Sequence, residues 1–163
     1  MAKIFTKKGD CGMTSLGNGL RVEKDDVRIE VNGEMDELNA LLGLVRSMLP
    51  MDSEEGLKLK NLQHLLMCMM SYIAFCKELE IQQFEDALKQ MEYDIEQLRG
   101  ERKFDFVAPG SSQIEAFLHL ARTQVRSVER RLCTVNHTYL LHPVVLKFMN
   151  RLSDYLFALA EKH

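Results

Sequence analysis

Long amphipathic segments with very few breaks constrain this fold most. From about residue 35 onwards, apolar side chains recur at the i, i+3, i+4, i+7 spacing that places them on one face of an α-helix. The three prolines, Pro50, Pro109 and Pro143, stand between the periodic segments. Helices joined by short connections bury their apolar faces against one another. The pattern therefore predicts an all-α fold, a five-helix up-and-down bundle.

Capping signals and periodicity set the expected bounds of the helices. We expect helices over about 35–49, 53–78, 82–99 and 112–134, and from 143 to the C-terminus. Asp52 or Ser53 can cap the second helix. Ser111 or Ser112, together with Glu115, resembles a capping box at the start of the fourth.

The N-terminal 33 residues lack helical periodicity. Four of the nine glycines stand in the segment GDCGMTSLGNG, a density that favours turns and close backbone approach over regular structure. We therefore expect an irregular arm over 1–33, attached to a helical bundle over 34–163. A chain of 163 residues fits one domain, so 1–163 is expected to fold as a single unit.

Composition narrows the classes of function. With 21 basic and 24 acidic residues the formal charge is −3, so no global positive field favours nucleic acid or anionic membranes. No segment approaches the ~20 apolar residues of a membrane span, and MAKIFTKKGD has no apolar signal core. Cys11, Cys68, Cys76 and Cys133 form no CxxC motif and are expected to be free, buried thiols. These features predict a cytoplasmic protein.

The glycine-rich segment is the first candidate for anion binding. Glycines, hydroxyls and cations gather there: Lys7, Lys8, Gly9, Asp10, Gly12, Thr14, Ser15, Arg21, Lys24 and Arg28. Backbone N–H groups can approach an oxyanion, and the cations neutralise phosphate charge. A Walker loop is excluded because Asn18 stands where the lysine is required. The alternative is an ordinary N-terminal arm without a ligand.

Three arginines on one face of the expected fourth helix are the second candidate. Arg122, Arg126, Glu129 and Arg130 follow i, i+4, i+7, i+8 spacing. Three guanidinium groups in such a stripe make a strong clamp for a polyanion. A solvated basic face with an internal Glu–Arg pair is the alternative.

Polar residues on two other helices are weaker candidates. Asp36, near Asn39, can orient an arginine from another helix or simply stabilise the N-terminal end of its own. Asn150 and Asp154 share one helix face, and either line a site or hydrogen-bond within the bundle. His119 is expected to be a packing or surface histidine.

Six segments, in order along the chain, resemble one known family. They are TKKGDCGMTSL, RVEKDDVRIE, GEMDELNALLGLVR, FVAPGSS, HLARTQVRSVERRL and HPVVLKFMNRLSDYLFALA. The chain resembles the ATP:cob(I)alamin (corrinoid) adenosyltransferases of the propanediol-utilisation (PduO) type. The resemblance covers nearly the whole chain and is weakest over 50–103.

The resemblance implies a homotrimer of five-helix bundles with active sites at the subunit interfaces. It implies transfer of the 5′-deoxyadenosyl group of ATP to Co(I) of cobalamin, giving adenosylcobalamin and triphosphate, with Mg²⁺ accompanying ATP. A corrinoid reductase and an adenosylcobalamin-dependent enzyme are then possible partners. Because Co(I) is itself the nucleophile, the reaction needs no protein base, and the protein aligns the reactants and stabilises the leaving triphosphate.

Matching segment to segment implies roles for individual residues. The phosphate-binding part of the arm would comprise Thr6, Lys7, Gly9, Asp10, Gly12, Thr14, Ser15 and Lys24. Arg122 and Arg126 would be the catalytic, ATP-contacting arginines, and Asp36 the carboxylate that pairs with Arg122 across the interface. Glu129 and Asn150 would make further contacts to the nucleotide and Mg²⁺.

The remaining matches include one aromatic residue and five departures. Phe106 would lie under the corrin and displace its lower axial ligand. The family patterns TKTGDKGTTSL, AYG and PGG are altered at Lys8, Cys11, Met13, Asn32 and Ser111. Loss of a lysine at position 11 would remove a phosphate contact worth about 1.5–3 kcal/mol. Two alternatives follow: a weakened family member that binds ATP or adenosylcobalamin as a sensor or carrier, and a helical interaction protein.

Overall fold

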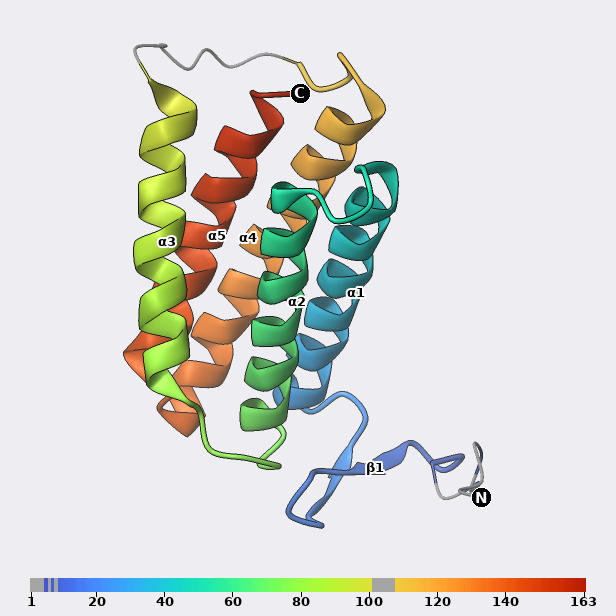
Figure 1. The fold of residues 1–163 in the computed structure, drawn as a ribbon. Helices are drawn as coiled ribbons and strands as arrows, with labels where there is room; N and C mark the ends of the chain where they lie inside the picture. The colour runs from blue at the N-terminus through green and yellow to red at the C-terminus, as the bar shows by residue number, and fades with distance from the viewer. Residues whose placement is uncertain (1–4, 6, 8, 101–107) are drawn as a thin grey trace.

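Five helices make up most of the residues that the computed structural model describes, which are 5, 7, 9–100 and 108–163. They are α1 (Val27–Met48), α2 (Glu54–Ile73), α3 (Ile81–Arg99), α4 (Gln113–Tyr139) and α5 (Pro143–Ala160). Successive helices run in opposite directions (Figure 1), which confirms the predicted five-helix up-and-down bundle. None of these described helices is both long and apolar enough to cross a membrane.

The helices do not follow chain order around the bundle. α4 packs against both α1 and α5, α3 packs on α5, and α2 packs on α1 (Figure 1). α2 and α3 are consecutive in the chain, yet they contact each other much less. A single apolar core draws on all five helices, with Met35, Leu66, Phe84, Leu118 and Phe148 among its largest fully buried side chains. Because α4 has a neighbour on each side and the core behind it, it keeps one outward face.

The start of α1 differs from the prediction. The helix begins at Val27, not near residue 35, because Asp26 caps it by accepting a hydrogen bond from the N–H of Arg28. The first inward-facing position of this helix is Arg28, and the next is Val31. Because a charged residue occupies a core position, the apolar periodicity is not visible in the sequence at the start of this helix. The arm is therefore shorter than expected.

The other helix ends lie close to their signals. Ser53, not Asp52, caps α2 by accepting from the N–H of Gly56, and Ser112 caps α4 by accepting from the N–H of Glu115. α2 ends at Ile73, earlier than expected, and α4 continues to Tyr139, beyond the expected end. Helix ends depend on local capping more than on periodicity.

The N-terminal arm contains a small antiparallel hairpin. Its strands are β1 (Met13–Ser15) and β2 (Arg21–Glu23), with Thr14 opposite Val22. The expectation that this segment excludes regular structure is therefore wrong for three of its residues. Gly12 and Gly19 have positive φ angles of 79° and 84°, so the glycines form the turns while the residues between them pair. Leu16 and Val22 are the buried apolar residues of the hairpin.

The expectation that the four cysteines are buried is wrong. All four are free, but all four are exposed. Cys68 lies on α2 next to buried Met69, and Cys133 lies on α4 next to buried Leu132. In a helix, adjacent residues point about 100° apart, so a cysteine in an apolar segment can still face outward.

Candidate functional site

The arginines of the predicted stripe on α4 lie in different environments. Arg122 is half-buried, and Arg126 is exposed with no hydrogen-bond or ion-pair partner in the described part of the chain. Arg130 donates to the Ser127 hydroxyl at 3.0 Å. Arg131, outside the predicted stripe, instead fastens α4 to two glutamates of α1. Arg122 and Arg126 thus lie one turn apart on the outward face of α4, and neither is paired with a carboxylate of the described residues.

Glu129 and Asn150, both assigned to the nucleotide and Mg²⁺ by the resemblance, lie next to each other. The Asn150 amide donates to Glu129 Oε1 at 3.4 Å, which links α5 to α4. Asp154 does not join them, because Arg151 binds it at 2.8 Å and also binds Glu92 of α3 at 3.1 Å. Asn150 and Asp154 therefore differ in their surroundings, although both lie on one face of α5. Asn150 contacts the arginine-bearing helix α4, whereas Asp154 belongs to a surface ion-pair network.

Asp36 meets no arginine among the described residues. It is exposed on α1, far around the helix from buried Leu38, and it has no hydrogen-bond or ion-pair partner in that part of the chain. Its carboxylate therefore faces outward without a described counter-charge.

Part of the glycine-rich arm forms a compact turn around Lys24. The N–H of Gly12 donates to the carbonyl of Gly9 at 3.3 Å, and the N–H of Lys24 donates to the carbonyl of Gly12 at 2.8 Å. A Cβ on Gly9 would lie 3.5 Å from Lys24 Nζ, so the ammonium group is directly beside Gly9. The structure thus brings these three predicted residues together.

The other predicted arm residues lie around this turn. Lys7 and Asp10 are exposed, and Thr14 and Ser15 lie on β1. Thr6 and Phe106 lie outside the described residues, as does Lys8. Figure 1 shows the arm extending sideways from the lower end of the bundle. Within one chain the arm and the arginines of α4 therefore form two separate parts.

Arg28 is predicted from the sequence as one of the phosphate-binding cations, but its side chain points into the protein. Its side chain is only 5% exposed and its guanidinium lies 2.6 Å from the Asp26 carboxylate. The guanidinium also lies over two rings, 4.2 Å from that of Tyr139 and 5.5 Å from that of Phe75. The Arg28 hydrogen bond holds the pKa of Asp26 below its ordinary value, against the effect of burial. This cluster joins the base of the arm to α4 and to the α2–α3 loop.

A second contact docks the hairpin itself. The N–H of Gly17 donates to the carbonyl of Ala74 at 2.7 Å. A Cβ on Gly17 would lie 2.8 Å from the Cα of Cys76, which leaves no room for a side chain there. The arm is therefore anchored at its base, although it extends away from the bundle.

Sequence reasoning missed a buried pair next to Arg122. His119 is 5% exposed and Glu115 is 6% exposed, and His119 Nε2 lies 3.2 Å from Glu115 Oε1. His119 Nδ1 accepts a hydrogen bond from Arg122 Nε at 3.2 Å. The signal was present in the i, i+4, i+7 spacing of the three residues, which places them on one helix face.

The departures from the family pattern have clear positions. Cys11 is exposed in the turn before β1, and Met13 is the first residue of β1. The Asn32 amide donates to the carbonyl of Met70 at 3.2 Å, which joins α1 to α2. The backbone N–H of Ser111 donates to Glu115 Oε2 at 3.2 Å.

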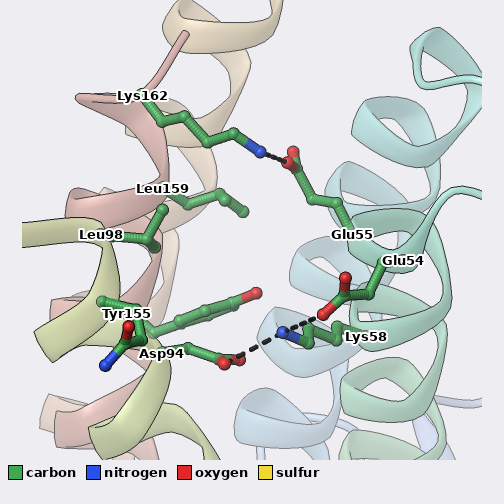
Figure 2. Close-up of a pocket in the computed structure, with 9 residues that line it drawn as sticks. Glu54, Glu55, Lys58, Asp94, Leu98, Tyr155, Leu159 and Lys162 are labelled. Carbon is green, nitrogen blue, oxygen red and sulfur yellow. Dashed lines mark hydrogen bonds and ion pairs between the residues drawn. The ribbon is translucent and has the colours of Figure 1, made fainter.

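A hollow of about 170 Å³ lies between α2, α3 and the end of α5 (Figure 2). Lys58 there binds Glu54 at 2.8 Å and Asp94 at 3.0 Å, and Lys162 binds Glu55 at 2.7 Å. Burial works to lower the pKa of Lys58, but the hydrogen bonds to its two carboxylates raise it overall. Both lysines of this hollow are paired with carboxylates, so it offers no free cation to a phosphate.

The fold and these contacts define a helical-bundle protein with basic residues on an outward helix face and in an anchored N-terminal arm. The sequence profile described as cobalamin adenosyltransferase matches residues 4–163. The chain belongs to the cobalamin adenosyltransferase family, which confirms the resemblance seen in the sequence.

Individual relatives support the same assignment. The corrinoid adenosyltransferase of Bacillus subtilis (strain 168) is 35% identical over 164 residues, which cover 97% of this chain and 84% of that protein. A variant PduO-type ATP:corrinoid adenosyltransferase from Lactobacillus reuteri, complexed with cobalamin and ATP, superposes with a TM-score of 0.88 at 30% identity, covering 97% of this chain and 91% of that one. A second variant, complexed with ATP, gives 0.86 at 30% identity, with 98% and 93% covered.

Proposed function

We infer that this protein is an ATP:corrinoid adenosyltransferase, which transfers the 5′-deoxyadenosyl group of ATP to the cobalt of a corrinoid and releases triphosphate. The family match over residues 4–163 carries this inference. The guanidinium groups of Arg122 and Arg126 on α4, neither of which is paired with a carboxylate of the described residues, supply the cations that such a leaving group needs.

The reaction explains why arginines suffice at this site. The electron pair of Co(I) forms the bond to C5′ of ATP while the bond from C5′ to the triphosphate oxygen breaks, and that pair leaves with the triphosphate. No proton has to be removed, so no side chain acts as a base. Arg122 and Arg126 stay charged at every physiological pH, hold the triphosphate in line, and stabilise the charge that develops on it.

Glu129 and Asn150 suit a Mg²⁺ ion shared with the triphosphate. Among the described residues no three His, Cys, Asp or Glu side chains gather into a metal cage. Mg²⁺ needs no such cage, because it usually binds one or two carboxylates, substrate phosphates and water. The Glu129 carboxylate beside the Asn150 amide fits that arrangement, and the ion would neutralise part of the phosphate charge.

A homotrimer completes the site in our proposal. Neither Asp36 nor Arg126 has a partner among the described residues, and a neighbouring copy can bring its arm and its carboxylate to the arginines of α4. Lys7, Gly9, Asp10, Gly12, Thr14, Ser15 and Lys24, together with Thr6, then surround the phosphates. Phe106 is assigned to the lower face of the corrin, where it excludes water and the lower ligand.

The chemistry of the reaction indicates the cellular compartment and the partner enzymes. Co(I) must persist until it attacks, so the protein works in a reducing compartment, which we take to be the cytoplasm. A corrinoid reductase supplies Co(I), and an adenosylcobalamin-dependent enzyme consumes the product.

The test is an anaerobic assay with chemically reduced cob(I)alamin and MgATP, following loss of the Co(I) absorbance and release of triphosphate. The wild-type protein should convert cob(I)alamin and release one triphosphate for each cob(I)alamin converted. Arg126→Ala should lower kcat by about 10²–10³-fold, because it removes one charged donor to the transition state. Its molecular mass in gel filtration should not change. Lys60→Ala, which removes an exposed cation on α2, is the matched control and should match wild type.

Two outcomes would contradict the proposal. An Arg126→Ala protein with the wild-type kcat would remove the arginine from the reaction. Calorimetric ATP binding by the wild type without any cobalamin conversion would instead support the sensor or carrier alternative.

A further inference from the structure

A chain of polar contacts runs from the backbone before α4 to the side chain of Arg122. Glu115 Oε2 accepts from the N–H groups of Gly110 at 2.7 Å and Ser111 at 3.2 Å. The other oxygen of that carboxylate, Oε1, lies 3.2 Å from His119 Nε2. His119 Nδ1 in turn accepts from Arg122 Nε at 3.2 Å.

The hydrogen-bond roles in this chain are fixed by chemistry. An arginine Nε–H is only a donor, so His119 Nδ1 must be the acceptor and must carry no proton. The ring proton is therefore on Nε2, which lies 3.2 Å from Glu115 Oε1. In this tautomer His119 is a neutral imidazole between the Glu115 carboxylate and the Arg122 guanidinium.

Burial makes this linkage rigid. Both Glu115 and His119 are almost completely enclosed, and the ring of Phe157 on α5 lies 5.9 Å from the His119 ring and 5.9 Å from Arg122 Cζ. A long arginine side chain otherwise samples many rotamers. Holding its Nε edge against His119 leaves the two Nη groups of Arg122 to face a ligand.

We propose that His119 and Glu115 are positioning residues, which orient the guanidinium of Arg122 for the leaving triphosphate and tie it to the backbone at Gly110 and Ser111. The proposal rests on the proposed function, because it concerns the same reaction. Misplacing a catalytic group by about 1 Å can lower a rate by about 100-fold, so we expect loss of this orientation to lower kcat by about 10- to 100-fold.

A purely structural role is the competing explanation. Glu115 is the third residue of α4, where a carboxylate stabilises the helix N-terminus without any part in catalysis. In that case substitutions would change stability, and kcat would not depend on which atom of His119 is replaced.

Two substitutions of His119 separate these explanations. Asn places its side-chain oxygen near the position of Nδ1 and can still accept from Arg122, whereas Gln places its amide near the position of Nε2 and can still donate to Glu115. We expect His119→Asn to keep kcat within about threefold and His119→Gln to lose about 10- to 100-fold, with a smaller change in KM for ATP. His64→Gln, at an exposed histidine of α2, is the control.

A third measurement tests the link through Arg122 directly. Arg122→Lys has no Nε–H, so adding His119→Gln to it should cause no further loss of kcat. Equal losses in His119→Asn and His119→Gln, or additive losses in the Arg122→Lys background, would overturn the proposal. Failure of the wild type to convert cob(I)alamin would refute the proposed function itself, which keeps the two failures distinguishable.

Discussion

Asp26→Asn is the substitution whose effect the structure determines most directly. It removes the counter-charge of Arg28, which is 4% exposed and lies over two aromatic rings. The asparagine oxygen can still accept from the N–H of Arg28, so the cap of α1 is kept. The substitution therefore isolates the ion pair from the helix cap.

The magnitude follows from the burial of the pair. Removing one partner of a buried ion pair costs about 3–5 kcal/mol, because the other charge stays buried. The Asp26 side chain is 17% exposed, so water reaches this pair and we expect the lower end of that range, about 3 kcal/mol. Asp25→Asn, which neutralises the exposed neighbour, should change stability by less than about 0.5 kcal/mol.

The assay is urea unfolding at one fixed protein concentration, since any subunit association adds a concentration dependence. The double variant Asp26→Asn/Arg28→Met replaces the pair with neutral groups and should recover most of the loss. A loss below about 1 kcal/mol in Asp26→Asn, or no recovery in the double variant, would refute the reasoning.

The same pair gives a pH dependence with a definite sign. The pKa of Asp26 is lower in the folded protein than its ordinary value of about 3.9, so its contribution is fully present above that pH. The contribution is lost as the pH falls below about 4 toward the folded pKa. The stability difference between wild type and Asp26→Asn should therefore shrink on acidification and stay constant between about pH 6 and 8.

Two further substitutions test the anchored arm and the start of α4. Gly17→Ala would place a Cβ 2.8 Å from the Cα of Cys76, so we expect the hairpin to leave its docking position. Calorimetry should then show weaker ATP binding while the bundle unfolds as in the wild type, and unchanged ATP affinity would disprove the link. Ser112→Ala removes the oxygen that accepts from the N–H of Glu115 at 3.0 Å and should destabilise the protein by about 1 kcal/mol in urea. Ser111→Ala, at the exposed neighbour, should have no such effect, and equal losses would contradict the capping assignment.

Features that depend on local spacing could be predicted from the sequence. Apolar periodicity indicated all five helices, and the i, i+4 spacing of Arg122 and Arg126 placed both guanidinium groups on one face of α4. Ser53 and Ser112 were identified as possible caps because capping involves residues only three positions apart. Each of these features needs only the geometry of a single helix.

Features that depend on which helices meet were decided by the tertiary structure. Arg28 looked like a phosphate-binding cation, but Phe75 and Tyr139, both distant in sequence, enclose it in the interior. Asp36 was matched to Arg122, yet its side of α1 faces away from the core of its own chain. His119 lies on the same helix as Arg122, and its role emerged only from the burial that α5 provides through Phe157. Sequence spacing specifies the face of a helix on which a side chain lies, whereas packing between distant segments decides whether that face meets a ring, a carboxylate or water.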